Sequence, residues 1–310
     1  MVDRLLIRKI QGITKSVLLL GPRQVGKSTL LRTLKPDLVI DLALEADFFH
    51  FSTQLDRLET LIEDQAPQVV LIDEIQRIPA LLNTIQALLD EAKRNGVKLR
   101  FLLSGSSARK LRRGHANLLR GRVFTYDLSG ICAKVVDYEF DVRRALRFGF
   151  LPEPFFEEND AICEKLLTSY SATYLKEEIQ AESLSRNIQG FARFLNVVAV
   201  VSGQILDFSK VSSKSKVSRT SCVRFVEILE DTLIAHRVPV FAESAGADVI
   251  KHPKLFFFDV GVLNGLLRNF TVSADRIGNL YEHLVYGLIR NSAFARDEPP
   301  TWPGRAGGVA

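Results

Sequence analysis

The stretch GPRQVGKSTL at residues 21–30 constrains the fold of this chain more than any other feature, and it follows directly on the apolar run VLLL. It fits the pattern GxxxxGK[ST] between a predicted strand and a predicted helix, the context in which such a loop binds phosphate. Its glycines let the backbone turn so that N–H groups face phosphate oxygens, and the helix adds the positive end of its dipole. The predicted nucleotide-binding residues are Gly21, Pro22, Arg23, Gln24, Val25, Gly26, Lys27, Ser28 and Thr29.

Two side chains of this loop have predicted chemical roles. Lys27 would contact the β- and γ-phosphates of ATP, and the hydroxyl of Ser28 would hold Mg²⁺. The alternative is a glycine-rich turn that joins a strand to a helix and binds nothing. The motif in its context, together with the acidic strand end described next, favours the nucleotide.

A second apolar run, VVLI at residues 69–72, ends in the adjacent carboxylates Asp73 and Glu74. A buried strand of a parallel sheet presents such residues at its carboxyl edge, where the ligands of these sheets bind. Asp73 is therefore a predicted Mg²⁺ ligand, and Glu74 is predicted to orient and deprotonate the attacking water. Alone, the pair could equally be acids that end a strand, but the phosphate loop upstream favours the catalytic interpretation.

A third apolar run, LRFLLSGSS at residues 99–107, ends in small polar residues and places Ser104 where a γ-phosphate or an attacking water could be sensed. Ser and Gly after a strand are also ordinary turn residues. A basic segment follows, and any of its arginines could be a solvated surface residue or an arginine finger that reaches the nucleotide of a neighbouring subunit. The candidates are Arg109, Arg112, Arg113, Arg120 and Arg122.

Strand-like apolar runs alternate with helical patterns in the first part of the chain, which favours a parallel sheet covered by helices. The predicted strands are residues 17–20, 38–42, 69–72, 99–104 and 123–126. The predicted helices are residues 27–34, 55–65 and 81–94, and later 161–182 and 191–201. The expected fold class is therefore α/β, with a five-stranded P-loop core followed by a mainly helical region.

The alternation stops near Leu128, and the segment FGFLPEPF at residues 148–155 has the glycine and prolines of a connector. The tail, RDEPPTWPGRAGGVA, has little with which to form a core and is expected to be disordered. The expected parts are an ATPase core at 1–128, a connector at 129–160, a helical region at 161–240, an incomplete C-terminal α/β domain at 241–295 and a tail at 296–310.

Residues 205–240 predict a winged helix-turn-helix, in which Ser218 is the expected N-cap of the second helix. The expected elements are helices at 209–216 and 219–231 and a strand at 233–238, with Cys222, Phe225, Val226 and Leu229 as the buried stripe. The excess of basic residues suits contacts with DNA phosphates, while a module that only packs against protein is equally consistent. The candidate DNA contacts are Lys210, Lys214, Lys216, Arg219, Thr220 and Arg224.

The phosphate loop, the Asp73-Glu74 pair and the Ser104 strand, in this order, resemble the core of AAA-type ATPases. More narrowly, most of residues 5–290 resembles bacterial and archaeal AAA ATPases that carry an uncharacterised C-terminal domain. The motifs that carry the resemblance are GPRQVGKSTLL, VVLIDEIQRIP, FLLSGSSARKLRRG, ALRFGFLPEPF and SYSATYLKEEI. The resemblance implies ATP binding, ATP hydrolysis and the strand order 5-1-4-3-2, but it supplies no biological task.

Beyond Arg290 that family typically continues into a region that resembles restriction-type nucleases. This chain instead ends in a stretch rich in glycine and proline, so the resemblance implies a C-terminal truncation. Glu282 would then be a lone remnant of any carboxylate cluster, and we expect no nuclease activity.

The composition of the chain indicates the class of protein and its location. Hydrophobic residues make up 46% and charged residues 25% of the chain, the balance of a soluble globular protein. The sequence contains no apolar run of membrane-spanning length and begins with a charged segment, so we expect a cytoplasmic protein without a membrane partner. The net charge of +5 is too small to identify a nucleic-acid-binding protein by itself.

Two functions remain as hypotheses. The first is a Mg²⁺-dependent ATPase in which hydrolysis changes the relation between the core and the C-terminal region. The second is a switch in which ATP gates contact with duplex DNA or a protein, with little or no turnover. A homo-oligomer is required if an arginine finger acts between subunits. A truncated chain that does not fold is a third alternative.

Overall fold

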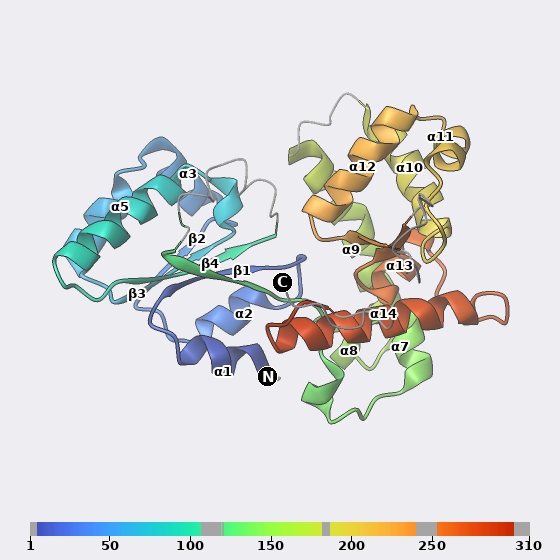
Figure 1. The fold of residues 1–310 in the computed structure, drawn as a ribbon, viewed down its shortest axis with the longest axis horizontal. Coiled ribbons are helices and arrows are strands. Elements are labelled where there is room, and N and C mark those ends of the chain that lie inside the picture. Colours follow the sequence, from blue (N-terminus) through green and yellow to red (C-terminus); the bar gives the residue numbers. More distant parts are fainter. Residues whose placement is uncertain (1–4, 107–118, 120, 182–186, 240–252, 301–310) are drawn as a thin grey trace, which may run out of the picture. The chain divides into compact units, whose positions relative to one another are not determined.

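The structure is a computed structural model that describes residues 5–106, 119, 121–181, 187–239 and 253–300, apart from the side chains of residues 173–181. Figure 1 shows the fold as a ribbon. By its internal contacts the chain divides at Leu128 into two compact units. Unit 1 comprises residues 1–128 and 294–297, and unit 2 comprises residues 129–293 and 298–310.

Unit 1 is built on a five-stranded parallel sheet in the order β2-β3-β4-β1-β5 (Figure 1). Read from the opposite edge, the order is 5-1-4-3-2. Each strand lies within one residue of its predicted bounds, because buried apolar runs mark such strands clearly. The strands are β1 (Ser16–Leu20), β2 (Leu38–Asp41), β3 (Val69–Asp73), β4 (Arg100–Gly105) and β5 (Val123–Asp127).

Helices cover both faces of this sheet. Side chains alternate along each strand, so Ile72 and Leu103 face one layer, where they pack with Leu82 and Ile85. Figure 1 shows α1 and α2 on the opposite face from α5. The helices are α1 (Leu5–Gln11), α2 (Lys27–Arg32), α3 (Glu45–Thr53), α4 (Arg57–Gln65) and α5 (Leu81–Arg94).

The prediction of α5 at residues 81–94 is confirmed, whereas sequence analysis does not predict α3. In α3, Phe48 and Phe51 pack into the core, but Phe49 is 66% exposed, so the apolar pattern of this short helix is irregular. Glu45 and Asp47 lie in the first turn of α3, where they stabilise the positive end of the helix dipole. The helix therefore depends on its terminus and on packing more than on a periodic pattern.

Unit 2 is mainly helical and contains a two-stranded antiparallel sheet. No helix among the described residues is both long and apolar enough to cross a lipid bilayer. The helices are η3 (Ala133–Val136), α7 (Val142–Phe148), α8 (Pro152–Phe156), α9 (Asp160–Ala181), α10 (Ile188–Val200), α11 (Phe208–Ser215), α12 (Arg219–Asp231), α13 (Val260–Leu267) and α14 (Ile277–Ala295), and the strands are β6 (Ala235–Val238) and β7 (Lys254–Phe257).

Residues 129–160, the expected connector, instead form part of the core of unit 2. Ile131 and Phe150 are buried in one cluster with Leu284 of α14. Pro152 is the first residue of α8, a position where its missing N–H costs no hydrogen bond. Both prolines lie in α8 and Gly149 ends α7, so this segment is part of packed helices rather than a linker.

The helix-turn-helix predicted within residues 205–240 has its counterparts in α11, α12 and β6. Ser218 is confirmed as the N-cap of α12, since its Oγ accepts the N–H of Ser221 at 3.2 Å. β6 pairs with β7, which lies in the segment expected to form a separate α/β domain, so the two segments share one unit. Residues 240–252 and 301–310 lie outside the described residues. The predicted buried stripe is confirmed at Cys222, Phe225, Val226 and Leu229.

Asp259 is a buried carboxyl that joins three segments of unit 2. It follows β7, caps α13 by accepting the N–H groups of Gly261 (2.8 Å) and Val262 (3.1 Å), and accepts the N–H of Phe150 at 2.7 Å. Burial raises the pKa of Asp259 to about 6, against the opposing effect of these hydrogen bonds. The folded state therefore binds the proton of this carboxyl more tightly than the unfolded chain does.

We expect Asp259 to make the free energy of unfolding depend on pH. Its folded-state pKa lies above its unfolded value of about 3.9, so its stabilising contribution is complete below that value and is lost as the pH rises through about 6. Between about pH 4 and about pH 8, the free energy of unfolding of the wild type should fall on the order of 3 kcal/mol more than that of Asp259→Asn, whose amide cannot ionise. Urea denaturation measures both free energies. Parallel pH profiles for the two proteins would contradict the prediction.

Candidate nucleotide-binding site

The glycine-rich loop between β1 and α2 turns sharply at two residues. Gln24 (φ 60°) and Gly26 (φ 91°) lie in the left-handed region, and α2 begins directly after them. Gly21 donates its N–H to the carbonyl of Gly105 at 3.2 Å. A Cβ at Gly21 would lie 2.1 Å from the carbonyl oxygen of Leu128, so no side chain fits there and the loop stays tight against the sheet edge.

Lys27 is the first residue of α2, and its ammonium lies inside the loop. Its Nζ donates to the carbonyl oxygens of Gly21 and Pro22, both at 2.9 Å, and lies 4.0 Å from Oε1 of Glu74. The side chain is only 4% exposed, and a buried ammonium needs such partners. The contacts fix a positive charge between the loop and the acidic end of β3.

The carboxyl end of β3 places Asp73 beside Ser104 of β4, the adjacent parallel strand. The Ser104 hydroxyl donates to Oδ1 of Asp73 and accepts the backbone N–H of Glu74 at 3.0 Å. Ser104 is fully buried and Asp73 is 4% exposed. The sequence predicts Ser104 as a sensor of phosphate or water, whereas its contacts in the structure are those of a residue that positions Asp73 and Glu74.

Glu74 follows β3 in the left-handed conformation (φ 55°, ψ 44°), which costs a non-glycine residue about 1 kcal/mol. Its Oε2 accepts from Nε2 of Gln76 and from the hydroxyl of Ser106 at 3.0 Å. The same Gln76 nitrogen also donates to Ser106 Oγ at 2.9 Å. Because the three side chains form a closed triangle of hydrogen bonds, the carboxylate of Glu74 is held in one place.

Gln76 and Ser106 are site residues that no motif in the sequence identifies. Gln76 lies in η1 (Ile75–Arg77), a 3-10 turn directly after Glu74, and Ser106 follows β4. They are 5% and 0% exposed, and buried polar side chains are costly unless they are hydrogen-bonded. Their spacing is the one signal in the sequence that could have identified them, since Gln76 lies two residues after Glu74 and Ser106 two residues after Ser104.

The other predicted residues of the loop differ in exposure. Ser28 is the second residue of α2, so it lies in the first helical turn at the same sheet edge as Asp73. Of the remaining residues, Pro22 and Val25 are buried, Arg23, Gly26 and Ser28 are half-buried, and Gln24 and Thr29 are exposed.

Among the arginine-finger candidates, Arg122 is the one that lies within the described residues. Arg122 precedes β5 at the amino edge of the sheet, whereas the phosphate loop lies at the carboxyl edge. Its guanidinium pairs with the carboxylate of Asp90 through two contacts of 2.7 Å, which hold the pKa of Asp90 below its usual value. Arg122 therefore ties β5 to α5. The other candidates, Arg109, Arg112, Arg113 and Arg120, lie outside the described residues.

The candidate DNA contacts are all exposed on unit 2. Arg219, Thr220 and Arg224 are exposed and lie within about 140° of one another around α12, given about 100° per residue. Lys210 lies 3.9 Å from the carboxylate of Asp207, which caps α11. The full exposed set is Lys210, Lys214, Lys216, Arg219, Thr220 and Arg224.

A parallel sheet with this glycine loop, a buried lysine and acids at the end of β3 defines the class of P-loop nucleotide-binding proteins. Within that class, residues 14–135 match the family model of the AAA domain, and residues 139–273 match a domain of unknown function (DUF8612). The chain thus carries an AAA domain followed by that uncharacterised domain, which confirms the family resemblance in the sequence.

Two curated relatives are uncharacterised proteins of Mycobacterium bovis and Mycobacterium tuberculosis, each 28% identical to this chain over 290 residues. Each match covers 90% of this chain and 64% of the relative, so the chain spans less than two thirds of the length of these relatives.

Three solved structures are similar to this chain with TM-scores of 0.29 to 0.33. The replication initiator DnaA bound to AMPPCP and single-stranded DNA is 13% identical, with a TM-score of 0.33 over 73% of this chain and 86% of that one. A variant of Thermotoga maritima RuvB is 14% identical, with a TM-score of 0.33 over 76% and 86% of the two chains. The Orc1 protein of Aeropyrum pernix in complex with DNA is 12% identical, with a TM-score of 0.29 over 88% and 93%.

We expect Gly21→Ala to destabilise unit 1, because its Cβ would overlap the carbonyl oxygen of Leu128. Overpacking of this kind costs about 1–3 kcal/mol, and more where the obstacle is backbone. Gly12→Ala is the matched control, since a Cβ there meets only the Lys9 carbonyl oxygen at 3.9 Å. Thermal denaturation followed by circular dichroism should show a lower Tm for Gly21→Ala alone. Equal Tm values for both variants would show that the loop moves away from Leu128 without cost.

Proposed function

We propose that this chain binds Mg·ATP at the loop of residues 21–29 and hydrolyses it, with Glu74 as the general base. The observation that carries the proposal is the convergence of Lys27, Asp73 and Glu74 at one edge of the sheet. Phosphate binding alone would require the loop and the lysine. Hydrolysis also requires a group that activates water, and Glu74, whose carboxylate is held by Gln76 and Ser106, is suited to that role.

Binding of the triphosphate is supported by the backbone of the loop. A tight glycine turn followed by a helix N-terminus offers N–H groups and a positive dipole end to anionic oxygens. Lys27 would exchange the carbonyls of Gly21 and Pro22 for β- and γ-phosphate oxygens.

The residues present also fit Mg²⁺, which prefers oxygen donors such as carboxylates and hydroxyls. Asp73 and Ser28 are the proposed ligands. Ser104 bonds Oδ1 of Asp73 and so orients this carboxylate. Bound Mg²⁺ would neutralise negative charge that develops on the phosphates during transfer.

Glu74 would accept a proton from the attacking water as the oxygen of that water bonds to the γ-phosphorus, while the bond from this phosphorus to the β–γ bridging oxygen breaks and ADP leaves. Its Oε2 already accepts two hydrogen bonds, while Oε1 lies toward Lys27, at 4.0 Å from Nζ. Gln76 and Ser106 therefore act as positioning residues for the base. A positioned base of this kind typically contributes about 10²–10⁴-fold in rate.

Replacing the base should separate binding from hydrolysis. We expect Glu74→Gln to lower phosphate release at least about 100-fold while ATP binding persists, because the amide cannot take the proton. Lys27→Ala should weaken binding and hydrolysis together. Glu59→Gln, which removes an exposed carboxylate of α4, is the control and should change neither. The measurements are phosphate release and equilibrium binding of ATP by purified protein.

The second hypothesis, a nucleotide-gated switch, predicts a different pattern from the same experiment. Wild type and Glu74→Gln would then bind ATP equally, and neither would release phosphate. That outcome would eliminate the ATPase while leaving nucleotide binding intact.

We further propose that α11, α12, β6 and β7 form a winged helix that contacts duplex DNA. The proposal is supported by the exposed basic residues of α11 and of the first turns of α12. Arg237 of β6 pairs with Glu230 at the other end of α12, so the acidic end of this helix is partly neutralised. A surface that contacts protein is the alternative.

DNA binding through phosphates should weaken steeply with salt. We expect Arg219→Gln and Arg224→Gln each to reduce the slope of log affinity against log salt by about 1, since each removes one phosphate contact. Lys134→Gln, which removes an exposed cation of η3, should leave the slope unchanged. Fluorescence anisotropy with labelled duplex DNA measures this slope. Absent or salt-independent binding would favour the alternative of protein contact.

A further inference from the structure

We propose that unit 2 contains a binding site for a small phosphate-bearing ligand, distinct from the phosphate loop of unit 1. The site is a pocket of about 720 Å³ between α7, the start of α9 and the loop that follows α13. This volume lies in the range of small-molecule sites. The pocket lies in the domain of unknown function, so a ligand here would give that domain its first assigned binding activity.

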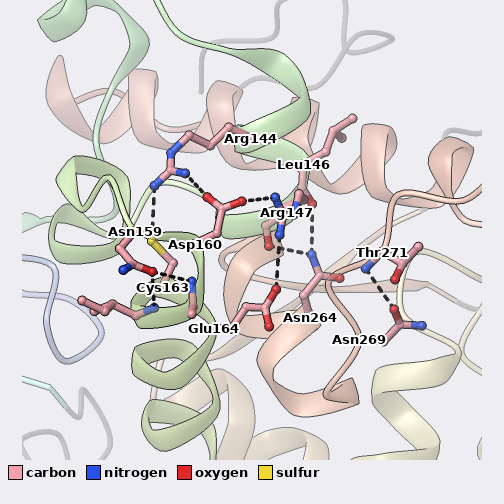
Figure 2. A network of polar contacts seen from close by, with 12 residues as sticks. Arg144, Leu146, Arg147, Asn159, Asp160, Cys163, Glu164, Asn264, Asn269 and Thr271 are labelled. Atoms are coloured by element: carbon pink, nitrogen blue, oxygen red, sulfur yellow. Dashed lines mark hydrogen bonds and ion pairs between the residues drawn. The ribbon is translucent and has the colours of Figure 1, made fainter.

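Most charges in this pocket are paired within the protein. The carboxylate of Asp160 accepts from both Arg144 and Arg147, and Arg147 also donates to Glu164 at 3.2 Å. Figure 2 shows the two guanidiniums converging on Asp160. Asp141 uses its carboxylate to cap α7. The ion pairs with Arg144 and Arg147 offset the negative charges of Asp160 and Glu164, which would otherwise repel an anion.

Two cations of the lining, Arg143 and Arg268, stand apart from this network. Both side chains are exposed, and neither guanidinium has a hydrogen bond or ion pair to any part of the chain that the structure describes. They come from two different elements, α7 and the residue that ends α13. The lining holds four arginines and three carboxylates, so one net positive charge remains for a ligand.

Arginine is the side chain best suited to phosphate, because its planar fork can donate two hydrogen bonds to two oxygens of one group. Two such forks, which line one pocket from separate elements, would together hold one phosphate group. Asp141, Asp160 and Glu164 alternate with the arginines in the lining, so the pocket offers no continuous basic surface for a long polyanion such as duplex DNA. The chemistry therefore favours a compact phosphate ester or pyrophosphate.

Buried hydrogen bonds hold the walls of the pocket in place. Asn264 is fully buried, donates to the carbonyl of Arg147 at 2.9 Å and accepts from Arg276 at 2.7 Å. Arg276 also donates to the carbonyls of Asn269 (3.0 Å) and Thr271 (2.7 Å), which fixes the loop after α13. Figure 2 shows Asn264 between α7 and this loop. Preformed walls lower the entropic cost of binding a ligand.

The test uses inorganic pyrophosphate as the probe and the full chain with Lys27→Ala, which weakens the phosphate loop of unit 1. Isothermal titration calorimetry should detect binding to this protein. Adding Arg143→Gln or Arg268→Gln should weaken that binding about tenfold each, the loss expected for one charged hydrogen-bonding partner. Lys165→Gln removes an exposed cation of α9 outside the pocket lining and should leave the affinity unchanged.

Three outcomes would overturn the proposal. One is the absence of pyrophosphate binding to the Lys27→Ala protein at millimolar concentrations. Another is equal weakening by Lys165→Gln, which would indicate general electrostatic attraction. The third is competition by duplex DNA with the same dependence on Arg143 and Arg268, which would assign this surface to a nucleic acid. Circular dichroism spectra that match the parent protein would show that the exposed-arginine variants are folded.

Discussion

The parallel pairing of β1, β4 and β3 is the interaction on which the candidate nucleotide site depends. Leu19 lies opposite Ser104, and Ile72 lies opposite Leu103, so the three strands end at the same edge of the sheet. This register brings together the glycine loop, the serine of β4 and the acids after β3, which are far apart in sequence. A slip of one residue would turn Ser104 to the other face and separate it from Asp73.

Buried polar side chains at this edge form a connected set of hydrogen bonds, so each one restricts the position of its neighbour. Ser104 contacts both Asp73 and the backbone of Glu74, while Gln76 and Ser106 hold the carboxylate of Glu74. In surroundings of low dielectric such hydrogen bonds are strong, and an unpaired group would be costly. The left-handed backbone of Glu74 is stabilised by the same contacts, which links local strain to the position of the proposed base.

Unit 2 relies on buried polar residues in a similar way, although its elements are helices. Asp259 accepts backbone N–H groups from two separate segments, and Asn264 with Arg276 joins α7 to the loop after α13. These contacts explain why residues 129–160 are core rather than connector, since Phe150 is anchored through its backbone as well as its ring. They also shape the arginine-lined pocket, whose walls come from three parts of the chain.

The sequence by itself determined what depends on local pattern. Apolar runs predict the five strands, the glycine spacing predicts the phosphate loop, and the capping serine predicts the start of α12, because each requires only neighbouring residues. Tertiary structure alone decided which distant side chains meet. The contacts of Gln76 with Ser106, the pairing of Arg122 with Asp90 and the pocket beside Arg143 depend on how separate elements pack, and no periodicity or motif within one segment encodes that geometry.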